Sequence, residues 1–124
     1  MNLAKLGAFV CGLSVCLGAF GAHAIASILE AKAIEWWQTA TEYLWYHGLG
    51  FLCLWSINER YNVERIIMRT LLPGVILFSG SLYVYAFTGW RPLGMITPIG
   101  GTLLLAGWVW LAFAIRNHSV TGSE

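Results

Sequence analysis

Three ionisable side chains, His23, Glu42 and His47, fall within strongly apolar parts of the sequence. Tyr43 and Tyr46 stand between the last two, so Glu42–Tyr46 and Tyr43–His47 are pairs spaced four residues apart, which are neighbours on a helix surface. Histidine is the side chain that ordinarily titrates closest to neutral pH, and a carboxyl group is a natural partner for it. These residue types therefore suit the binding of a proton or a small polar ligand.

The apolar segments around these side chains have the length of membrane-spanning helices. Such a helix needs about 20 mostly apolar residues. Four segments qualify, at about residues 3–24, 39–57, 70–88 and 97–115. The second contains Glu42 and His47, and the last two carry no Asp, Glu, Lys or Arg. We expect an all-α, four-helix transmembrane bundle that forms a single integral membrane domain over residues 1–124.

The composition agrees with this fold class. Hydrophobic residues make up 58% of the chain and charged residues 10%, whereas about a quarter of an ordinary soluble domain is charged. So few charges cannot cover a soluble surface, and the lipid bilayer is the expected surrounding. The net charge of +1 offers no basic patch for a row of phosphates, so no nucleic-acid partner is expected. The three cysteines form no CxxC pair and are expected to act as small packing residues.

Residues 25–38 differ from the apolar segments on either side. Apolar residues alternate there with Glu30, Lys32 and Glu35 at helical spacing, and Trp36 and Trp37 suit the headgroup region of a bilayer. We expect an additional short amphipathic helix that lies on the membrane surface and runs into the second span.

The beginning of the chain also has features of a secretory signal. Lys5 precedes an apolar run, and Ala22-His23-Ala24 has the form of a cleavage site. The apolar run is longer than the roughly 7–15 residues of a signal core, so we expect an uncleaved first span.

The basic residues predict how the bundle is oriented. With four spans, both termini and the link between spans two and three share one side of the membrane. That side carries Lys5, Arg60, Arg65, Arg69 and Arg116, and the other carries Lys32 and Arg91. The positive-inside rule then places both termini in the cytoplasm, in a bacterial inner membrane or its mitochondrial equivalent. Arg60, Arg65 and Arg69 are also candidates for binding lipid headgroups, although orientation alone is sufficient to account for them.

Polar side chains of different spans are predicted to lie in the same, outer leaflet. In span two, Glu42 is expected about one turn from the outer membrane surface, and His47 lies deeper. In span three, Ser79, Ser81 and Tyr83 fall in the same outer half of the membrane. One interpretation is a set of interhelical hydrogen bonds, each worth about 0.6 and at most about 1.7 kcal/mol. The other is a small cavity around His23, Glu42 and His47 that passes protons or holds a quinone, a lipid headgroup or a metal.

No cofactor and no metal ion is predicted. His23 and His47 could ligate a haem only at a common depth, and their depths differ by about 10 Å or more. A zinc ion would need three or four ligands, and only these histidines and Glu42 are near.

Small residues indicate where the helices pack closely, since lipid provides no hydrophobic drive for their association. One stripe in the first span has spacings of three and four, namely Gly7, Cys11, Ser14, Gly18 and Ala22. Gly100 and Gly101 are the corresponding candidates in the fourth span.

Four motifs occur in a recognisable order. They are Gly-Ala-Phe-Gly-Ala-His at 18–23, Trp-Gln-Thr-Ala-Thr-Glu-Tyr at 37–43 with His47, Phe-Ser-Gly-Ser-Leu-Tyr at 78–83, and Thr-Pro-Ile-Gly-Gly at 97–101 with Gly107-Trp108. Over about residues 4–112, the chain resembles the family called domain of unknown function four hundred and twenty-three. The resemblance implies a small four-helix protein of bacterial inner membranes or mitochondria, and it implies no activity. Gly48 departs from the family pattern, where Ala is expected, and residues 25–38 look peculiar to this chain.

The sequence thus predicts a multi-pass membrane protein that is not an enzyme, since no nucleophile is paired with a base at a recognisable spacing. The first hypothesis is a structural or accessory subunit that packs against itself or a larger membrane complex. The alternative is a transporter or a protein that binds a proton, a quinone or another small ligand at the polar cluster around His23, Glu42 and His47.

Overall fold

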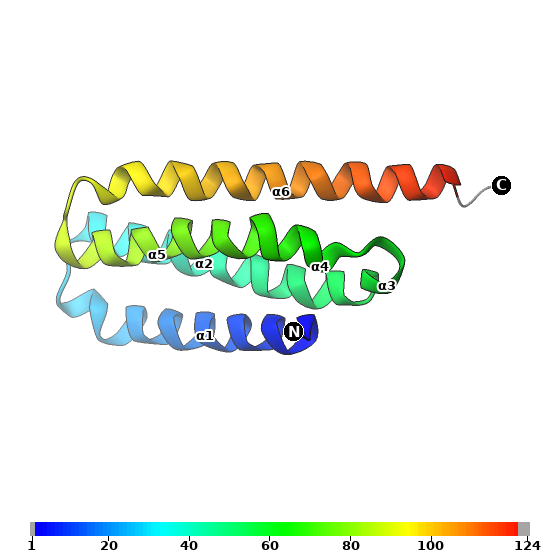
Figure 1. Cartoon of the computed structure of the whole chain (residues 1–124). Coiled ribbons are helices and arrows are strands. Elements are labelled where there is room, and N and C mark those ends of the chain that lie inside the picture. Colours follow the sequence, from blue (N-terminus) through cyan, green and yellow to red (C-terminus); the bar gives the residue numbers. More distant parts are fainter. Residues whose placement is uncertain (1, 122–124) are drawn as a thin grey trace.

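The computed structural model describes residues 2–121, and the side chains of residues 2–116 within them. Helices make up this part of the chain and no strand occurs in it, which confirms the predicted all-α class. Four long helices lie side by side (Figure 1), namely α1 (Leu3–His23), α2 (Ala31–Trp55), α5 (Leu72–Thr88) and α6 (Leu93–Thr121). The connecting elements are η1 (Ile25–Ser27), α3 (Asn58–Tyr61), α4 (Val63–Ile66) and the π-helical turn η2 (Ile67–Leu71).

Successive long helices run antiparallel, so α2 packs between α1 and α5, and α5 packs against α6. The α1–α2 and α5–α6 turns lie at one end of the bundle (Figure 1). The N-terminus of α1, the link through α3 and α4, and the C-terminal end of α6 lie toward the other end. We call these the hairpin end and the link end.

Three segments of the described chain are long and apolar enough to cross a membrane: Leu3–Ser27, Val63–Thr88 and Leu93–Arg116. They contain the predicted first, third and fourth spans. The predicted second span lies in α2, which has 25 residues but is not among the three. Its length is sufficient, and its lower hydropathy follows from residues such as Gln38, Glu42 and His47.

The predicted surface helix over residues 25–38 needs correction. Residues 25–27 form the short turn η1, and residues 31–38 are the first two turns of α2. The physical reason is Trp37, which is only 5% exposed and whose indole Nε1 donates a hydrogen bond to the Leu17 carbonyl of α1 at 2.9 Å. This contact holds the start of α2 alongside α1 and inside the bundle.

Two apolar clusters form the interior. The larger joins all four long helices and the link, and its completely buried members are Phe51, Val63, Ile67 and Leu71. The smaller surrounds Trp37 near the hairpin end and contains Ile25, Ala33 and Ala86. The bundle therefore has its main apolar core toward the link end.

The predicted small-residue stripe of α1 faces α2 for most of its length. A Cβ atom on Gly7 would stand 2.9 Å from both the Gly48 carbonyl oxygen and the Leu52 nitrogen, so only glycine permits this approach. Cys11 touches Gly48, Ser14 is buried, and Gly18 lies near Thr41, whereas Ala22 is exposed. The stripe thus serves the contact with α2 rather than the outer surface.

The predicted glycines of α6 pack against α5. A Cβ atom on Gly100 would stand 2.8 Å from the Gly74 carbonyl oxygen and 2.9 Å from the Phe78 Cα. Gly101 lies beside the Phe78 ring. The two backbones approach as closely here as those of α1 and α2 do at Gly7.

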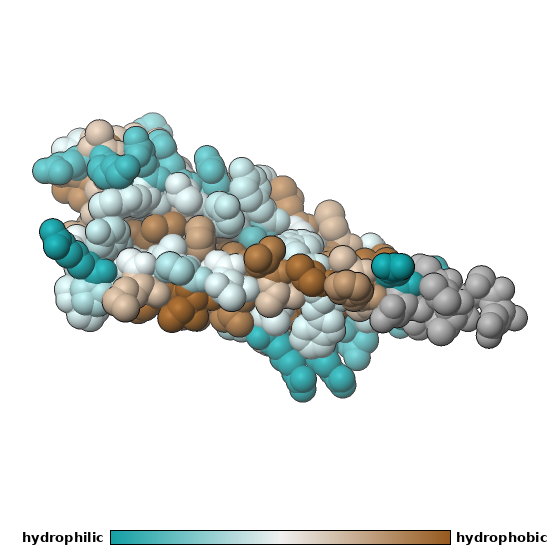
Figure 2. Space-filling model, turned by 90° about the horizontal axis from the view of Figure 1, so that it is seen from above, coloured by the Kyte–Doolittle hydropathy of each residue, from teal (hydrophilic) through white to brown (hydrophobic). Residues whose placement is uncertain are grey.

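The exterior carries large apolar side chains on every long helix. Examples more than half exposed are Phe9, Trp55, Ile76, Met95 and Leu105. Figure 2 shows hydrophobic side chains along the middle of the face seen from above, with hydrophilic ones gathered at one end and in a second group that projects from the side. A surface of this kind is suited to lipid and not to water.

Candidate functional site

Hydrogen bonds between side chains and neighbouring helices join α1, α2 and α5 near the hairpin end. Trp37 of α2 donates to the Leu17 carbonyl of α1, as described above. Thr41 donates its single hydroxyl proton to the Trp37 carbonyl at 3.0 Å, so it accepts from the Tyr83 hydroxyl of α5 at 2.8 Å. One continuous chain of hydrogen bonds therefore crosses three helices.

Two serines of α5 extend this pattern. Ser79 is 2% exposed and donates to the Ala40 carbonyl of α2 at 2.8 Å. Ser81 is also buried, and its hydroxyl lies 3.0 Å from the Phe78 carbonyl and 2.5 Å from the Thr97 hydroxyl of α6. The α5 helix is thus bonded through hydroxyl groups to the helices on both sides of it.

His47 connects α2 to α6 and has a defined protonation state. Its Nδ1 lies 2.7 Å from the Tyr43 carbonyl oxygen, which can only accept, so Nδ1 carries a proton. Its Nε2 lies 3.1 Å from the indole Nε1 of Trp108, which can only donate, so Nε2 carries none. The geometry therefore requires a neutral imidazole, and a second proton on Nε2 would break the bond to Trp108.

These side chains make up what we call the interhelical hydrogen-bond set: Trp37, Thr41, His47, Ser79, Ser81, Tyr83, Thr97 and Trp108. Within the described residues, every buried side-chain nitrogen or oxygen atom has a hydrogen-bond partner. In a bilayer such pairing stabilises helix association. The set joins α2 to each of its three neighbours.

The structure does not bring His23, Glu42 and His47 together. His23 is exposed at the last residue of α1, and His47 lies in the interior between α2 and α6. Glu42 is exposed on the outer side of α2 and has no hydrogen bond or ion pair to any described residue. The Tyr43 ring packs against the Phe78 ring at an interplanar angle of 39°, with ring centroids 4.4 Å apart.

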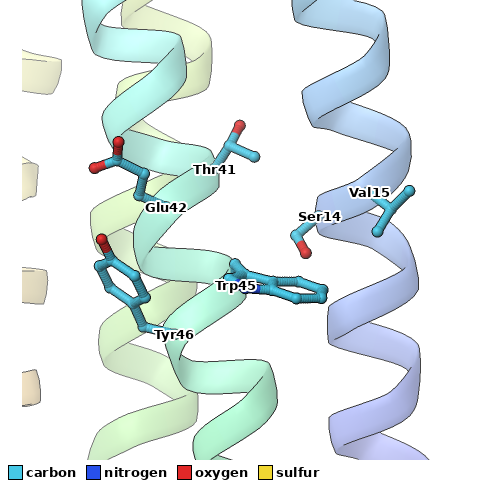
Figure 3. A pocket seen from close by; sticks show the side chains of 6 residues that line it. All are labelled: Ser14, Val15, Thr41, Glu42, Trp45 and Tyr46. Atoms are coloured by element: carbon cyan, nitrogen blue, oxygen red, sulfur yellow. The ribbon is translucent and has the colours of Figure 1, made fainter.

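Glu42 and Tyr46 border a hollow between α1 and α2. Figure 3 shows both side chains on the same side of α2, while Trp45 extends toward Ser14 of α1. The hollow has a volume of about 270 Å³. A second hollow of about 450 Å³ adjoins it toward the hairpin end and is lined by Gly18, Gly21, Ala22, Ile34, Trp37, Gln38, Thr41 and Glu42. Since Thr41 and Glu42 line both, we treat them as one feature, the α1–α2 groove.

The position of Glu42 along its helix differs from the predicted one. Because α2 begins at Ala31 and not near residue 39, Glu42 lies eleven residues into the helix, or about 16 Å at 1.5 Å per residue. Ser14 and Val15, which border the same groove, stand at the middle of the candidate span Leu3–Ser27. Glu42 is therefore level with the middle of the first candidate span.

Comparison with known proteins identifies the family. The family described as "Protein of unknown function (DUF423)" matches residues 17–101. The chain belongs to this family. The resemblance predicted from the four motifs is thereby confirmed, over a somewhat shorter range than predicted.

The relatives of this DUF423 chain are named as membrane proteins. A UPF0382 membrane protein of Haemophilus influenzae is 45% identical over 91% of this chain and 90% of its own length. The UPF0382 membrane protein YwdK of Bacillus subtilis is 34% identical over 91% and 94%. The UPF0382 inner membrane protein YgdD of Escherichia coli is 40% identical over 82% and 80%. No solved structure matches. With its apolar helices, the chain is a multi-pass membrane protein.

The DUF423 match contains nearly all of the interhelical hydrogen-bond set. Only Trp108 lies beyond the matched residues 17–101. Sequence reasoning missed Trp108 as a partner of His47. The sequence did contain an indication of this role. Trp108 lies well inside the fourth span and not at the headgroup level, so its indole N–H needs a hydrogen-bond acceptor within the protein.

Gly48, where a departure from the family pattern is predicted, lies at a close contact between α1 and α2 in this DUF423 chain. A Cβ atom on Gly48 would stand 2.8 Å from Cys11 Sγ and 2.9 Å from the Cys11 nitrogen. Glycine at position 48 therefore permits α1 to approach α2 this closely.

The arginine cluster of this DUF423 chain lies at the link end. Arg60, Arg65 and Arg69 are all exposed, and the Arg60 guanidinium stands over the Tyr61 ring at 5.3 Å. Among the described residues, no three His, Cys, Asp or Glu side chains gather as metal ligands. Cys11, Cys16 and Cys53 are free thiols.

Proposed function

We propose that this chain is a structural or accessory subunit of a membrane complex and has no enzymatic activity of its own. The observation that carries the proposal is the use of the buried polar side chains. The buried side chains of His47, Ser79 and Ser81 are engaged in bonds between helices, and so is the half-buried Tyr83. A group that already donates or accepts in this way is not available to a substrate without loss of a helix contact.

The exterior supports the same proposal. Trp45, Trp108 and Trp110 are each more than one third exposed along the length of the bundle. Tryptophan is enriched where proteins bind one another, because it contributes a large contact area. Part of this surface is thus suited to another membrane helix, from a second copy or from a larger partner.

We further propose that α2 also crosses the membrane and that both termini face the cytoplasm of a bacterial inner membrane. The antiparallel arrangement, with the N-terminus and the C-terminal end of α6 toward the link end, supports this topology (Figure 1). So does the excess of basic residues at that end, which includes Arg60, Arg65 and Arg69. A reporter active only in the cytoplasm should function when fused to either terminus. Activity at one terminus alone would indicate three crossings.

Native mass spectrometry of the protein, extracted from its own membrane in mild detergent, tests the subunit proposal. We expect the chain to leave the membrane bound to a second polypeptide or to further copies of itself. A bare monomer that keeps a small molecule would contradict the proposal and favour a ligand-binding role. A visible absorption scan of the same sample would show whether that molecule is a haem.

Replacement of His47 with Phe provides a second readout. The subunit proposal predicts that H47F weakens folding or assembly, because the bonds to Tyr43 and Trp108 are lost. The alternative, a protein that binds a proton or a small ligand at His47, predicts an intact bundle without its bound species. H23F is the matched control, since His23 is exposed at the end of α1.

A further inference from the structure

Glu42 carries an unpaired carboxyl group on the outside of the bundle, about halfway along its length. It lies about 16 Å along α2, and it borders the same groove as Ser14 and Val15 at the centre of the first span. No described side chain gives it a hydrogen bond or a counter-charge. Ionisable residues within a membrane are expensive, and by default they mark a functional site with a partner.

The chain itself contains no cation at this depth. Lys32 stands about 15 Å from Glu42 along α2, and Lys5 stands about 14 Å from Ser14 along α1. Every arginine lies at the link, in the α5–α6 turn or at the end of α6. A second copy in the same orientation therefore brings no lysine or arginine to Glu42. The partner must come from another molecule.

The walls of the α1–α2 groove have the chemistry of a cation site. Trp45 is 38% exposed and Tyr46 is 56% exposed, and both border the groove. Tyr46 lies on the same side of α2 as Glu42, and Trp45 extends toward α1 (Figure 3). Aromatic faces attract cations, most strongly when the cation is removed from water. The remaining wall is formed by small residues of α1, among them Gly18 and Ala22, which leave room for the apolar groups of a ligand.

The size of the groove fits a small molecule. Its larger part alone measures about 450 Å³, within the range of about 300–1,000 Å³ that is usual for ligand sites. The lining is apolar or aromatic with only Gln38, Thr41 and Glu42 as polar side chains along its larger part. Thr41 already bonds to Trp37 and Tyr83, so Glu42 and Gln38 remain for the ligand.

We propose that the α1–α2 groove binds a hydrophobic organic cation, such as a quaternary ammonium or phosphonium compound, with its charge at Glu42 and its apolar groups against Trp45 and Tyr46. The ligand enters from the lipid, since the groove lies on the outside of the bundle. This site goes beyond the proposed subunit role and does not depend on it, because the interhelical hydrogen-bond set and the groove use different side chains except for Trp37 and Thr41. It rests on the proposed crossing of the membrane by α2.

Equilibrium dialysis of the purified full chain in neutral detergent tests the proposal with tetraphenylphosphonium. Tetraphenylborate, an anion of nearly the same size and shape, is the matched probe. We expect the phosphonium cation to bind and the borate anion not to bind. E42Q should weaken binding of the cation about tenfold or more, as expected when one partner of a desolvated charge pair is removed, and E42D should retain part of it.

E35Q is the matched control variant, because Glu35 is an exposed carboxylate on the same helix, paired with Lys32 outside the groove. Size-exclusion chromatography and circular dichroism establish that each variant is folded. Equal binding of cation and anion, or wild-type affinity in E42Q, would overturn the proposal. So would a polypeptide that copurifies with the wild-type chain and is lost in E42Q without any change in phosphonium binding, since a basic partner helix would then be the occupant.

Discussion

The two ends of the bundle are held together by different interactions. Toward the hairpin end, Trp37, Thr41 and Tyr83 connect three helices by hydrogen bonds, and Ser81 reaches the fourth. Toward the link end, helices meet through glycine contacts such as that of Gly7, and the large apolar cluster fills the space between them. Lipid is as apolar as a leucine side chain, so helix association must come from close packing or from polar bonds. This small protein uses both, and the two kinds of contact also occur between the ends, where Gly100 packs against Phe78 and His47 bonds to Trp108.

The largest effect is expected where a glycine contact is filled. G7A should destabilise the fold by about 1–3 kcal/mol, because the new Cβ meets backbone atoms of Gly48 and Leu52 that cannot move without separating α1 from α2. Unfolding in mixed micelles with increasing sodium dodecyl sulfate measures the change. G12A is the matched control, since a Cβ on Gly12 meets nothing within 4 Å. Equal effects of both variants would show that backbone approach does not stabilise the link end.

Loss of the hydrogen bond between His47 and Trp108 should have the next largest effect on the free energy of unfolding. H47F removes the bonds to Trp108 and to Tyr43, and W108F leaves Nε2 of His47 without its donor. A double-mutant cycle with H47F and W108F should give a coupling free energy of about 0.6–1.7 kcal/mol, measured by the same unfolding assay. Additive single effects would mean that the contact contributes nothing to stability.

A smaller effect is expected from a single hydroxyl group at the hairpin end. Y83F removes the donor to Thr41 and should lower the free energy of unfolding by about 0.6 kcal/mol. Y85F is the matched control, because the Tyr85 ring packs against Trp36 and its hydroxyl is not part of the interhelical hydrogen-bond set. If Y85F destabilises as much as Y83F, loss of ring packing and not of the hydrogen bond accounts for the change.

The smallest effect on stability is expected at Glu42. Because Glu42 belongs to neither the glycine contacts nor the hydrogen-bond set, E42Q should change the free energy of unfolding by less than about 0.5 kcal/mol. The unfolding midpoint in mixed micelles measures this. A large loss of stability would place Glu42 among the structural groups and separate it from ligand binding.

Much of the fold could be predicted because apolar length is a direct signal of a membrane helix. Three segments, the all-α class and the family were predicted correctly. The start of α2 was not, since Trp36 and Trp37 occur equally in a surface helix and in a buried helix start. That single misplaced boundary also placed Glu42 too close to the start of its helix.

The candidate site could be predicted in part only, because helix rotation depends on contacts between distant residues. Polar residue types identified Ser79, Ser81, Tyr83 and His47 as members of one cluster. Spacing along α2 could not show that His47 turns inward to α6 while Glu42 turns outward. Thr41 stood within a recognised motif, but its role as the acceptor for Tyr83 becomes visible only when α5 lies beside α2.

The central place of α2 has a consequence for how the protein is made. This helix is hydrogen-bonded to α1, α5 and α6, yet it is the long helix not apolar enough to qualify as a span by composition. A segment of that kind gains little by entering lipid alone, and its polar groups find partners only after its neighbours are in place. During synthesis α2 should therefore enter the bilayer together with α1 as a hairpin, and its insertion is completed only when α5 and α6 emerge from the ribosome.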